Sequence, residues 1–274
     1  MSSESRARLA QIRHFVLDLD GTVYTGSRLH EDALDFLAAL QTRGSSYTFL
    51  TNNTSLSRQD YIEKLRAFGI EASSSQVCTP VSSTVASLRE SHPSVASLFV
   101  LGTDALRADF ESAGFAVGES AEADPDAVVV GFDTSLSYQR LCRAAWWISR
   151  GLPYLATHPD LVCPTEEPTI LVDCGSICAA LRAACGRDPD AVFGKPDPGM
   201  LEEIADRQGI AVGELAMVGD RLMTDMAMAT RAGALAILVL TGEATESDIA
   251  ELGPADPGRP DLVLKDLAAL TGIL

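Results

Sequence analysis

Residues 15–22 read Phe-Val-Leu-Asp-Leu-Asp-Gly-Thr, and no other stretch of the chain says as much about the fold. The three apolar residues at its start predict a short buried β-strand. Asp18 and Asp20 follow at once, and side chains two apart on an extended chain point the same way. We therefore expect both carboxylates to face one crevice at the carboxyl end of the strand. Taken alone, the pair is equally consistent with a solvated acidic turn.

The pattern of an apolar strand followed by a helix recurs along the chain. Apolar runs at 47–50, 215–218 and 234–240 predict three more strands. After the first strand, leucines at helical spacing predict a helix that ends at Gly44. After the second strand, Ser57 is placed to cap the start of another helix. This order predicts an α/β fold, a Rossmann-like doubly wound parallel sheet covered by helices.

A second alternating segment separates these blocks. Apolar runs at 98–101 and 128–130 predict strands, with helical patterns around them. We interpret 80–188 as an α/β domain inserted into a catalytic core formed by 1–79 and 189–274. The alternative is one large continuous sheet.

Composition and charge limit the function. The chain has 274 residues, 46% of them hydrophobic, and a net charge of −17 from 21 basic and 38 acidic residues. A chain this acidic repels nucleic acid and anionic membranes at long range. Neither is therefore expected as a partner. No apolar run approaches the roughly 18 residues that span a membrane. An anionic substrate would need local positive charge from a metal, a lysine or helix N-termini.

The cysteines and the N-terminus predict a cytoplasmic protein. Six cysteines are present without a Cys-x-x-Cys pair, a pattern that favours free thiols in a reducing compartment. Residues 1–11 are polar and lack the apolar region of a signal peptide.

Two further motifs could bind phosphate. Thr51, Asn52 and Asn53 follow the strand 47–50, and a hydroxyl with backbone N–H groups at a strand end can hold phosphate oxygens. Lys195 stands between a glycine and a proline, and its ammonium group could neutralise a nucleophile and a phosphoryl group together. Read singly, the first motif is also consistent with a polar turn and the second with a surface lysine.

A fourth motif follows the strand 215–218. Asp220 would meet a cation in the same crevice as Asp18, and Mg²⁺ prefers such oxygen ligands. Asp225 lies five residues further on, where it could orient Lys195, hold a water on the cation or simply cap a helix.

These four motifs, in this order over residues 15–242, resemble those of the haloacid dehalogenase (HAD) superfamily. The long insert after the second motif is similar to the C2-type α/β cap of the NagD-like, para-nitrophenylphosphatase branch (class IIA). The resemblance implies a Mg²⁺-dependent phosphomonoesterase that hydrolyses a small phosphorylated metabolite, such as a sugar phosphate, and accepts para-nitrophenyl phosphate as an artificial substrate. Two alternatives stay open: a phosphotransferase or mutase on the same fold, and a non-catalytic metabolite-binding protein.

The resemblance also assigns roles to matching positions. It implies that Asp18 is the nucleophile that becomes an aspartyl-phosphate, and that Asp20 is the general acid and base. The implied metal ligands are Asp18, Asp20 through its backbone carbonyl, and Asp220, with Asp225 beside them. Thr51 and Asn52 would hold the phosphoryl oxygens and Lys195 would neutralise charge. Arg221 and Thr224 are expected on the leaving-group side.

Specificity is expected to lie in the insert, with residues 156–178 as the candidate loop. His158 in this loop is expected to be structural or solvated rather than catalytic. Glu166 and Glu167 would disfavour strongly anionic leaving groups and suit sugars with many hydroxyls. A homo-oligomer formed through the cap is left open.

Overall fold

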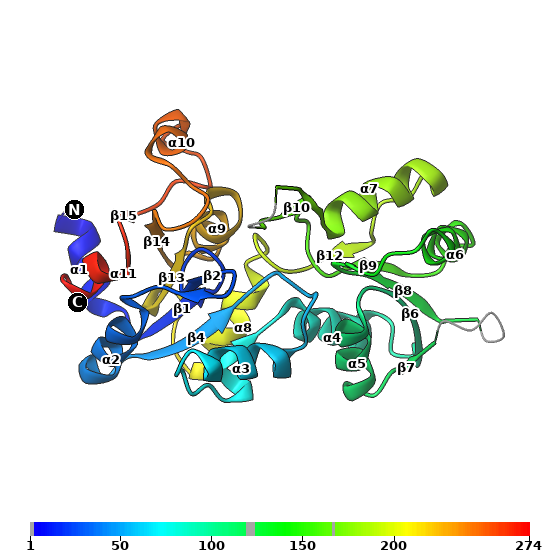
Figure 1. The fold of residues 1–274 in the computed structure, drawn as a ribbon, viewed down its shortest axis with the longest axis horizontal. Coiled ribbons are helices and arrows are strands. Elements are labelled where there is room, and N and C mark those ends of the chain that lie inside the picture. Colours follow the sequence, from blue (N-terminus) through cyan, green and yellow to red (C-terminus); the bar gives the residue numbers. More distant parts are fainter. Residues whose placement is uncertain (1–2, 119–123, 166–167) are drawn as a thin grey trace. The chain divides into compact units, whose positions relative to one another are not determined.

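The computed structural model describes residues 3–118, 124–165 and 168–274 and divides the chain into two compact units (Figure 1). The first unit comprises Met1–Thr51, Leu65–Cys78 and Lys195–Leu274, and the second comprises Asn52–Lys64 and Thr79–Gly194. Within the described ranges, no helix is both long and apolar enough to cross a membrane.

The first unit is built on a six-stranded parallel sheet. Its strands, in spatial order, are β15 (Leu262–Leu264), β14 (Leu235–Val239), β13 (Leu215–Gly219), β1 (His14–Asp18), β4 (Ser46–Leu50) and β5 (Val77–Cys78). In β1, Leu17 pairs with Val218 of β13 on one side and with Phe49 of β4 on the other. The carboxyl ends of these three strands therefore meet at one edge of the sheet.

Helices and short turns of helix complete the first unit. They are α1 (Ser3–Gln11), α2 (Ala33–Arg43), α8 (Gly199–Gln208), α9 (Ala227–Ala232), α10 (Glu246–Glu251), α11 (Leu267–Thr271), the 3-10 turns Ser74–Gln76 and Val212–Glu214, and the π-helical turn Leu222–Met226. A small antiparallel hairpin, β2 (Tyr24–Thr25) and β3 (Arg28–Leu29), follows β1. The helix α2 ends at Gly44, whose φ of 78° is the left-handed conformation that glycine adopts at low cost.

The second unit has its own five-stranded parallel sheet and a short antiparallel hairpin, β10 (Val162–Cys163) and β11 (Leu171–Val172). The strands of the sheet, in spatial order, are β12 (Ala191–Val192), β9 (Tyr154–Ala156), β8 (Ala127–Val130), β6 (Ser97–Leu101) and β7 (Ala116–Val117). Its helices are α4 (Pro80–Ser91), α5 (Asp104–Ser112), α6 (Tyr138–Ser149) and α7 (Cys174–Cys185). Alternate residues of β6 and β8 enter two different hydrophobic clusters, so helices cover both faces of this sheet.

One helix runs from one unit into the other. α3 (Arg58–Ala67) starts within Asn52–Lys64 and ends within Leu65–Cys78. Ser57 caps its start as expected, because the Ser57 hydroxyl accepts from the Asp60 N–H while the Asp60 carboxylate accepts from the Ser57 N–H.

The predicted fold class is confirmed, and the strands form two separate parallel sheets instead of the single continuous one. The contact units differ in detail from the predicted ranges, since 52–64, 79 and 189–194 group with 80–188. The role of that region as a cap that sets specificity stays a prediction.

A buried histidine in β1 leads to a prediction about acid stability. His14 is 1% exposed, and its two ring nitrogens lie 2.7 Å from Ser46 Oγ and 3.0 Å from Thr48 Oγ1. Burial, with a smaller contribution from the charge of Arg207, lowers the pKa of His14 from 6.5 to about 4. A lowered histidine pKa stabilises the fold above pH 6.5, and this stability is lost as the pH falls toward 4. At 1.36 kcal/mol per pKa unit, the loss is about 3 kcal/mol.

The measurement is urea unfolding of the wild type and of His14→Gln at several pH values between 7 and 4. We expect the wild type to lose stability more steeply than the variant, because only in the wild type does unfolding release a histidine that binds a proton in this pH range. Parallel curves for the two proteins would contradict the assignment.

Candidate active site

Polar side chains gather where β1, β4 and β13 end. Asp18 is the last residue of β1, Thr51 follows β4 and Asp220 follows β13. All three are at least 95% buried. The register of the sheet explains why residues so far apart in sequence meet at one edge.

Lys195 links two of the buried carboxylates. Its ammonium group donates to Asp18 Oδ1 and lies 2.6 Å from Asp225 Oδ1. The other oxygen of Asp225 accepts the backbone N–H of Arg221 at 3.1 Å. Lys195 is only 3% exposed, so its charge acts in a poorly solvated environment. Asp225 therefore forms an ion pair with the lysine, and a role in orienting it stays a prediction.

One carboxylate oxygen from each of Asp18, Asp220 and Asp225 lies within 4.8 Å of the other two. Three ionised carboxylates and one ammonium group leave two negative charges, which one divalent cation would balance. Asp220 Oδ1 is buried and makes no hydrogen bond to any described residue. An acceptor left in this state is costly unless a cation or a proton meets it, so the residues fit a hard divalent metal.

The pKa shifts reflect the same crowding. Burial raises the pKa of Asp18 well above its usual range, Asp225 and Asp220 add to the rise, and Lys195 opposes it. Burial and Asp225 raise the pKa of Asp220 to about 7, against the hydrogen bond from the Glu243 N–H. Burial alone would lower the pKa of Lys195, but Asp18 and Asp225 outweigh it and hold the lysine protonated.

A loop after β14 supports Asp220, and the sequence reading missed it. The Glu243 N–H donates to Asp220 Oδ2 at 2.7 Å, and the Ala244 N–H donates to the backbone oxygen of Asp220 at 3.0 Å. Gly242 packs so closely that a Cβ placed on it would overlap the Asp220 carboxylate, as would a Cβ on Gly21. The signal was available: residues 241–243 form a polar turn directly after an apolar strand, like the motifs at Asp18, Thr51 and Asp220.

We predict that Gly242→Ala weakens metal binding. The added methyl group must displace the Asp220 carboxylate, and changes to groups that hold metal ligands typically cost about 10–100-fold in affinity. The measurements are the Mg²⁺ concentration for half-maximal activity and the Mg²⁺-induced shift in the unfolding temperature. Gly253→Ala is the matched control, because a Cβ at Gly253 meets nothing within 4 Å. Equal Mg²⁺ requirements in the two variants would refute the idea.

The remaining predicted residues of the first unit lie around this cluster. Asp20 is exposed in the turn after β1, where the Gly21 N–H donates to the Tyr24 carbonyl. Arg221 pairs with Glu243 at 3.0 Å. Thr224 Oγ1 is buried and makes no hydrogen bond to a described residue. The carboxylate of Asp20 is not part of the three-carboxylate group, and its contact with a metal through the backbone oxygen stays a prediction.

Asn52 and Asn53 belong to the second unit and make their described side-chain contacts there. Asn52 Nδ2 donates to both oxygens of Asp160, at 3.1 and 3.2 Å. Asn53 Oδ1 accepts from the N–H and the hydroxyl of Ser55. Their predicted contact with a phosphoryl group stays a prediction.

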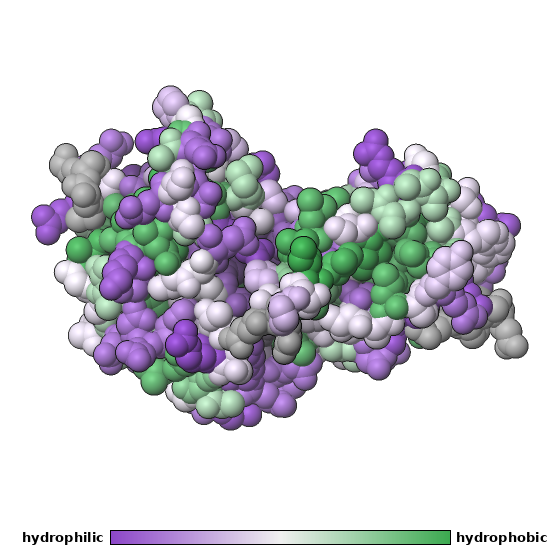
Figure 2. All heavy atoms as spheres, turned by 45° about the horizontal axis from the view of Figure 1, so that its top comes forward, coloured by the Kyte–Doolittle hydropathy of each residue, from purple (hydrophilic) through white to green (hydrophobic). Residues whose placement is uncertain are grey.

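The candidate specificity loop, residues 156–178, exposes several large apolar side chains. Large exposed apolar side chains lie in or beside the hairpin β10–β11, namely Leu161, Val162, Ile170 and Val172. Figure 2 shows hydrophobic residues gathered over the part of the second unit that carries β10. Glu166 and Glu167, expected to influence leaving-group choice, lie outside the described residues.

Two family models match the chain. Residues 15–116 match a model described as haloacid dehalogenase-like hydrolase, and residues 192–270 match one described as HAD-hydrolase-like. Together with the parallel sheet and the buried aspartates at its edge, these matches define the class. The chain belongs to the haloacid dehalogenase-like hydrolase family and is a phosphatase that acts on phosphate esters.

Known proteins place it in the NagD-like, para-nitrophenylphosphatase branch. It is similar to the crystal structure of a 4-nitrophenylphosphatase from Thermotoga maritima, with a TM-score of 0.89 and 40% identity over 97% of this chain and 98% of that one. It is 33% identical to a 5'-nucleotidase of Bacillus subtilis over 83% of this chain and 87% of the relative. A glycerol phosphate phosphatase from Mycobacterium tuberculosis, crystallised with magnesium, has a TM-score of 0.86 and 32% identity over 96% of this chain and 78% of that one.

Proposed function

We propose that this protein is a Mg²⁺-dependent phosphomonoesterase that hydrolyses a small phosphorylated metabolite through an aspartyl-phosphate on Asp18. The observation that carries the proposal is the buried group of Asp18, Asp220 and Asp225 around Lys195 at the carboxyl edge of the sheet. Phosphoryl transfer depends mainly on alignment and charge neutralisation, and this group supplies both.

In the first step, Asp18 attacks phosphorus. A bond forms between an Asp18 oxygen and phosphorus, and the bond from phosphorus to the ester oxygen breaks. Asp20 gives its proton to the departing oxygen. Lys195, held by Asp225, offsets the negative charge that would otherwise repel the phosphate from Asp18.

In the second step, water hydrolyses the aspartyl-phosphate. Asp20, now a carboxylate, takes a proton from the water as its oxygen bonds to phosphorus, and the bond to Asp18 breaks. Inorganic phosphate leaves, and both aspartates return to their starting states. Two carboxylates are needed because one must be free to move protons while the other is esterified.

Asp18 and Asp220 would hold Mg²⁺ with side-chain oxygens, and Asp20 would add its backbone carbonyl. The metal, when bound, supplies positive charge beside the nucleophile and the phosphoryl oxygens. The free Oδ1 of Asp220 and the two excess negative charges of the group are what support this assignment.

The substrate class is a phosphate monoester with a neutral or weakly charged leaving group, such as a sugar phosphate. The net charge of −17 disfavours leaving groups that carry several negative charges of their own. A phosphate-release screen over sugar phosphates, nucleotides, phosphoglycolate, glycerol phosphate, pyridoxal phosphate and para-nitrophenyl phosphate tests this choice. Preference for nucleoside di- and triphosphates would contradict it.

Removal of the metal tests the mechanism directly. We expect EDTA to stop release of para-nitrophenol from para-nitrophenyl phosphate, because two uncompensated negative charges would then face the phosphate. Addition of Mg²⁺ in excess of the chelator should restore the rate. Activity that persists in EDTA would rule out the metal assignment. Product that appears only when an acceptor alcohol or sugar is added would indicate a phosphotransferase.

A further inference from the structure

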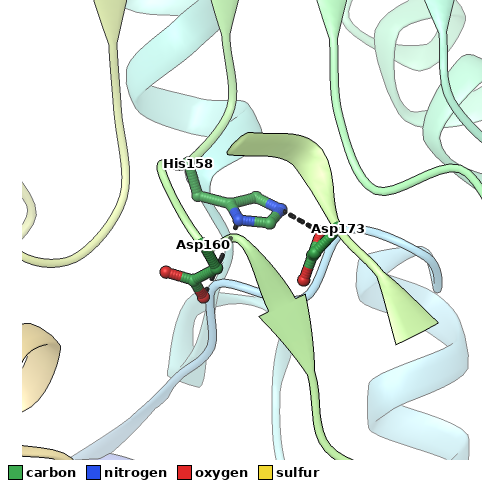
Figure 3. Close-up of side chains that lie close together, drawn as sticks. All are labelled: His158, Asp160 and Asp173. Atoms are coloured by element: carbon green, nitrogen blue, oxygen red, sulfur yellow. Dashed lines mark ion pairs between the residues drawn. The ribbon is translucent and has the colours of Figure 1, made fainter. Parts of the chain in front are cut away.

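A second buried group of charged side chains lies wholly in the second unit. His158, just after β9, has no exposed surface, and Asp160 and Asp173 stand beside it (Figure 3). Nδ1 of the ring lies 3.7 Å from Asp160 Oδ2, and Nε2 lies 3.5 Å from Asp173 Oδ1. Asp173 also caps helix α7, because its Oδ1 accepts the Cys174 N–H. The thiol of Cys174 contacts the backbone of His158.

The three side chains could be read as a metal site, since one ligand atom of each lies within 4.8 Å of the others. The arrangement in Figure 3 favours an ion-pair chain instead, because each carboxylate faces a different nitrogen of the ring. A single ion takes one nitrogen from a histidine, while a ring that donates both N–H groups pairs with a carboxylate on each side.

The chain of contacts continues to Asn52. Asp160 accepts from Asn52 Nδ2 with both of its oxygens, so the Asn52 carboxamide is held in one orientation. The carbonyl end of that carboxamide points at Gly194: a Cβ built on Gly194 would lie 2.6 Å from Asn52 Oδ1 and 3.0 Å from the His158 Cβ.

Asn52 and Gly194 share a special position in the chain. Asn52 is the first residue of the second unit and Gly194 is its last. Their neighbours along the chain, Thr51 and Lys195, belong to the first unit. The ion-pair chain therefore holds the immediate neighbours of a predicted phosphate-binding residue and of the buried lysine.

We propose that Asp173, His158 and Asp160 act as positioning residues that fix Asn52 and Gly194, and through them the backbone of Thr51 and Lys195. The inference rests on the proposed function, since it assigns these residues to the alignment of that site. Buried side chains paired in this way suit the task, because removal of one leaves its partners uncompensated and each member is held in place.

Asp160→Ala tests the proposal through substrate affinity. The variant removes the acceptor of Asn52 and the partner of His158, so we expect KM for para-nitrophenyl phosphate and the inhibition constant of inorganic phosphate to rise about tenfold. Partial unfolding would lower kcat but leave both constants unchanged. Asp160→Asn keeps one oxygen for Asn52, so it should restore most of the affinity.

Asp133→Asn is the matched control. Asp133 forms a buried ion pair with Arg140 at 2.8 Å in the same unit, and its other described partner is Ser135. Its loss should lower the unfolding temperature with KM unchanged. An unchanged KM in Asp160→Ala, or an equal rise in Asp133→Asn, overturns the proposal.

Three further outcomes can be told apart. A rise in unfolding temperature on adding Zn²⁺ that His158→Ala abolishes would make the group a metal site and overturn the positioning role. If Asp18→Asn is inactive while Asp160→Ala is unaffected, the positioning role fails and the proposed function stands. If Asp18→Asn keeps full activity, the proposed function fails regardless of Asp160.

Discussion

Asp18→Asn is expected to lower kcat by at least about 10⁴-fold while leaving the protein folded. The amide keeps the size of the carboxylate but is a very poor nucleophile, so no aspartyl-phosphate can form. The fold should tolerate the change, because Lys195 retains Asp225 as its partner. One of three crowded carboxylates also disappears, which reduces the repulsion among the buried carboxylates.

The decisive measurements are kcat, circular dichroism and trapping of a phosphorylated protein. The wild type, quenched in acid during turnover, should carry acid-stable, alkali-labile phosphate that is missing from Asp18→Asn. Asp35→Asn, a change to an exposed aspartate on α2, is the control and should match the wild type in all three. Substantial turnover by Asp18→Asn would rule out the covalent route.

Much of this site could be predicted because its signals are local. Each of the strands β1, β4 and β13 is a short apolar run that ends in polar residues, and parallel pairing brings such ends to one edge. The positions of Asp18 and Asp220 follow from that rule alone. Lys195 follows no strand of the first sheet, so its place depended on the family resemblance.

Other parts depend on contacts that no local pattern contains. The close approach of Gly242 to Asp220 arises because β14 pairs beside β13, which only the sheet order reveals. The grouping of Asn52 with Asp160 is similarly long-range, across 108 residues of sequence. His158 was expected to be structural or solvated, and the structure buries it, but its two carboxylate partners could not be identified from spacing.

Lys195→Met is expected to damage both stability and activity in the metal-free protein. Methionine fills similar space but leaves Asp18 and Asp225 without their buried cation, and the net charge of the group goes from −2 to −3. Breaking a buried ion pair from one side typically costs about 3–5 kcal/mol. We expect a loss of that size in EDTA at pH 8, and about a 10³-fold fall in kcat with Mg²⁺ present.

The pH dependence distinguishes this cause from poor packing of methionine. Carboxyl groups with raised pKa values stabilise the fold fully below their unfolded pKa, and this stability is lost as the pH rises through the folded value. Asp220, with a pKa raised to about 7, and Asp18, raised for the same reason, therefore repel each other increasingly as the pH rises from 4 to 8. The destabilisation by Lys195→Met should be larger at pH 8 than at pH 5, and Mg²⁺ should reduce it.

Lys265→Met is the control for this experiment. The Lys265 side chain is 88% exposed and lies 3.9 Å from Asp266, so its loss should change stability by less than about 1 kcal/mol at either pH. Urea unfolding of both variants at pH 5 and pH 8, with EDTA and with Mg²⁺, gives the comparison. If Lys195→Met were equally destabilised under all four conditions, packing would explain the loss. The buried lysine would then have no part in balancing the charge of the three carboxylates, and the electrostatic basis of the proposed mechanism would fail with it.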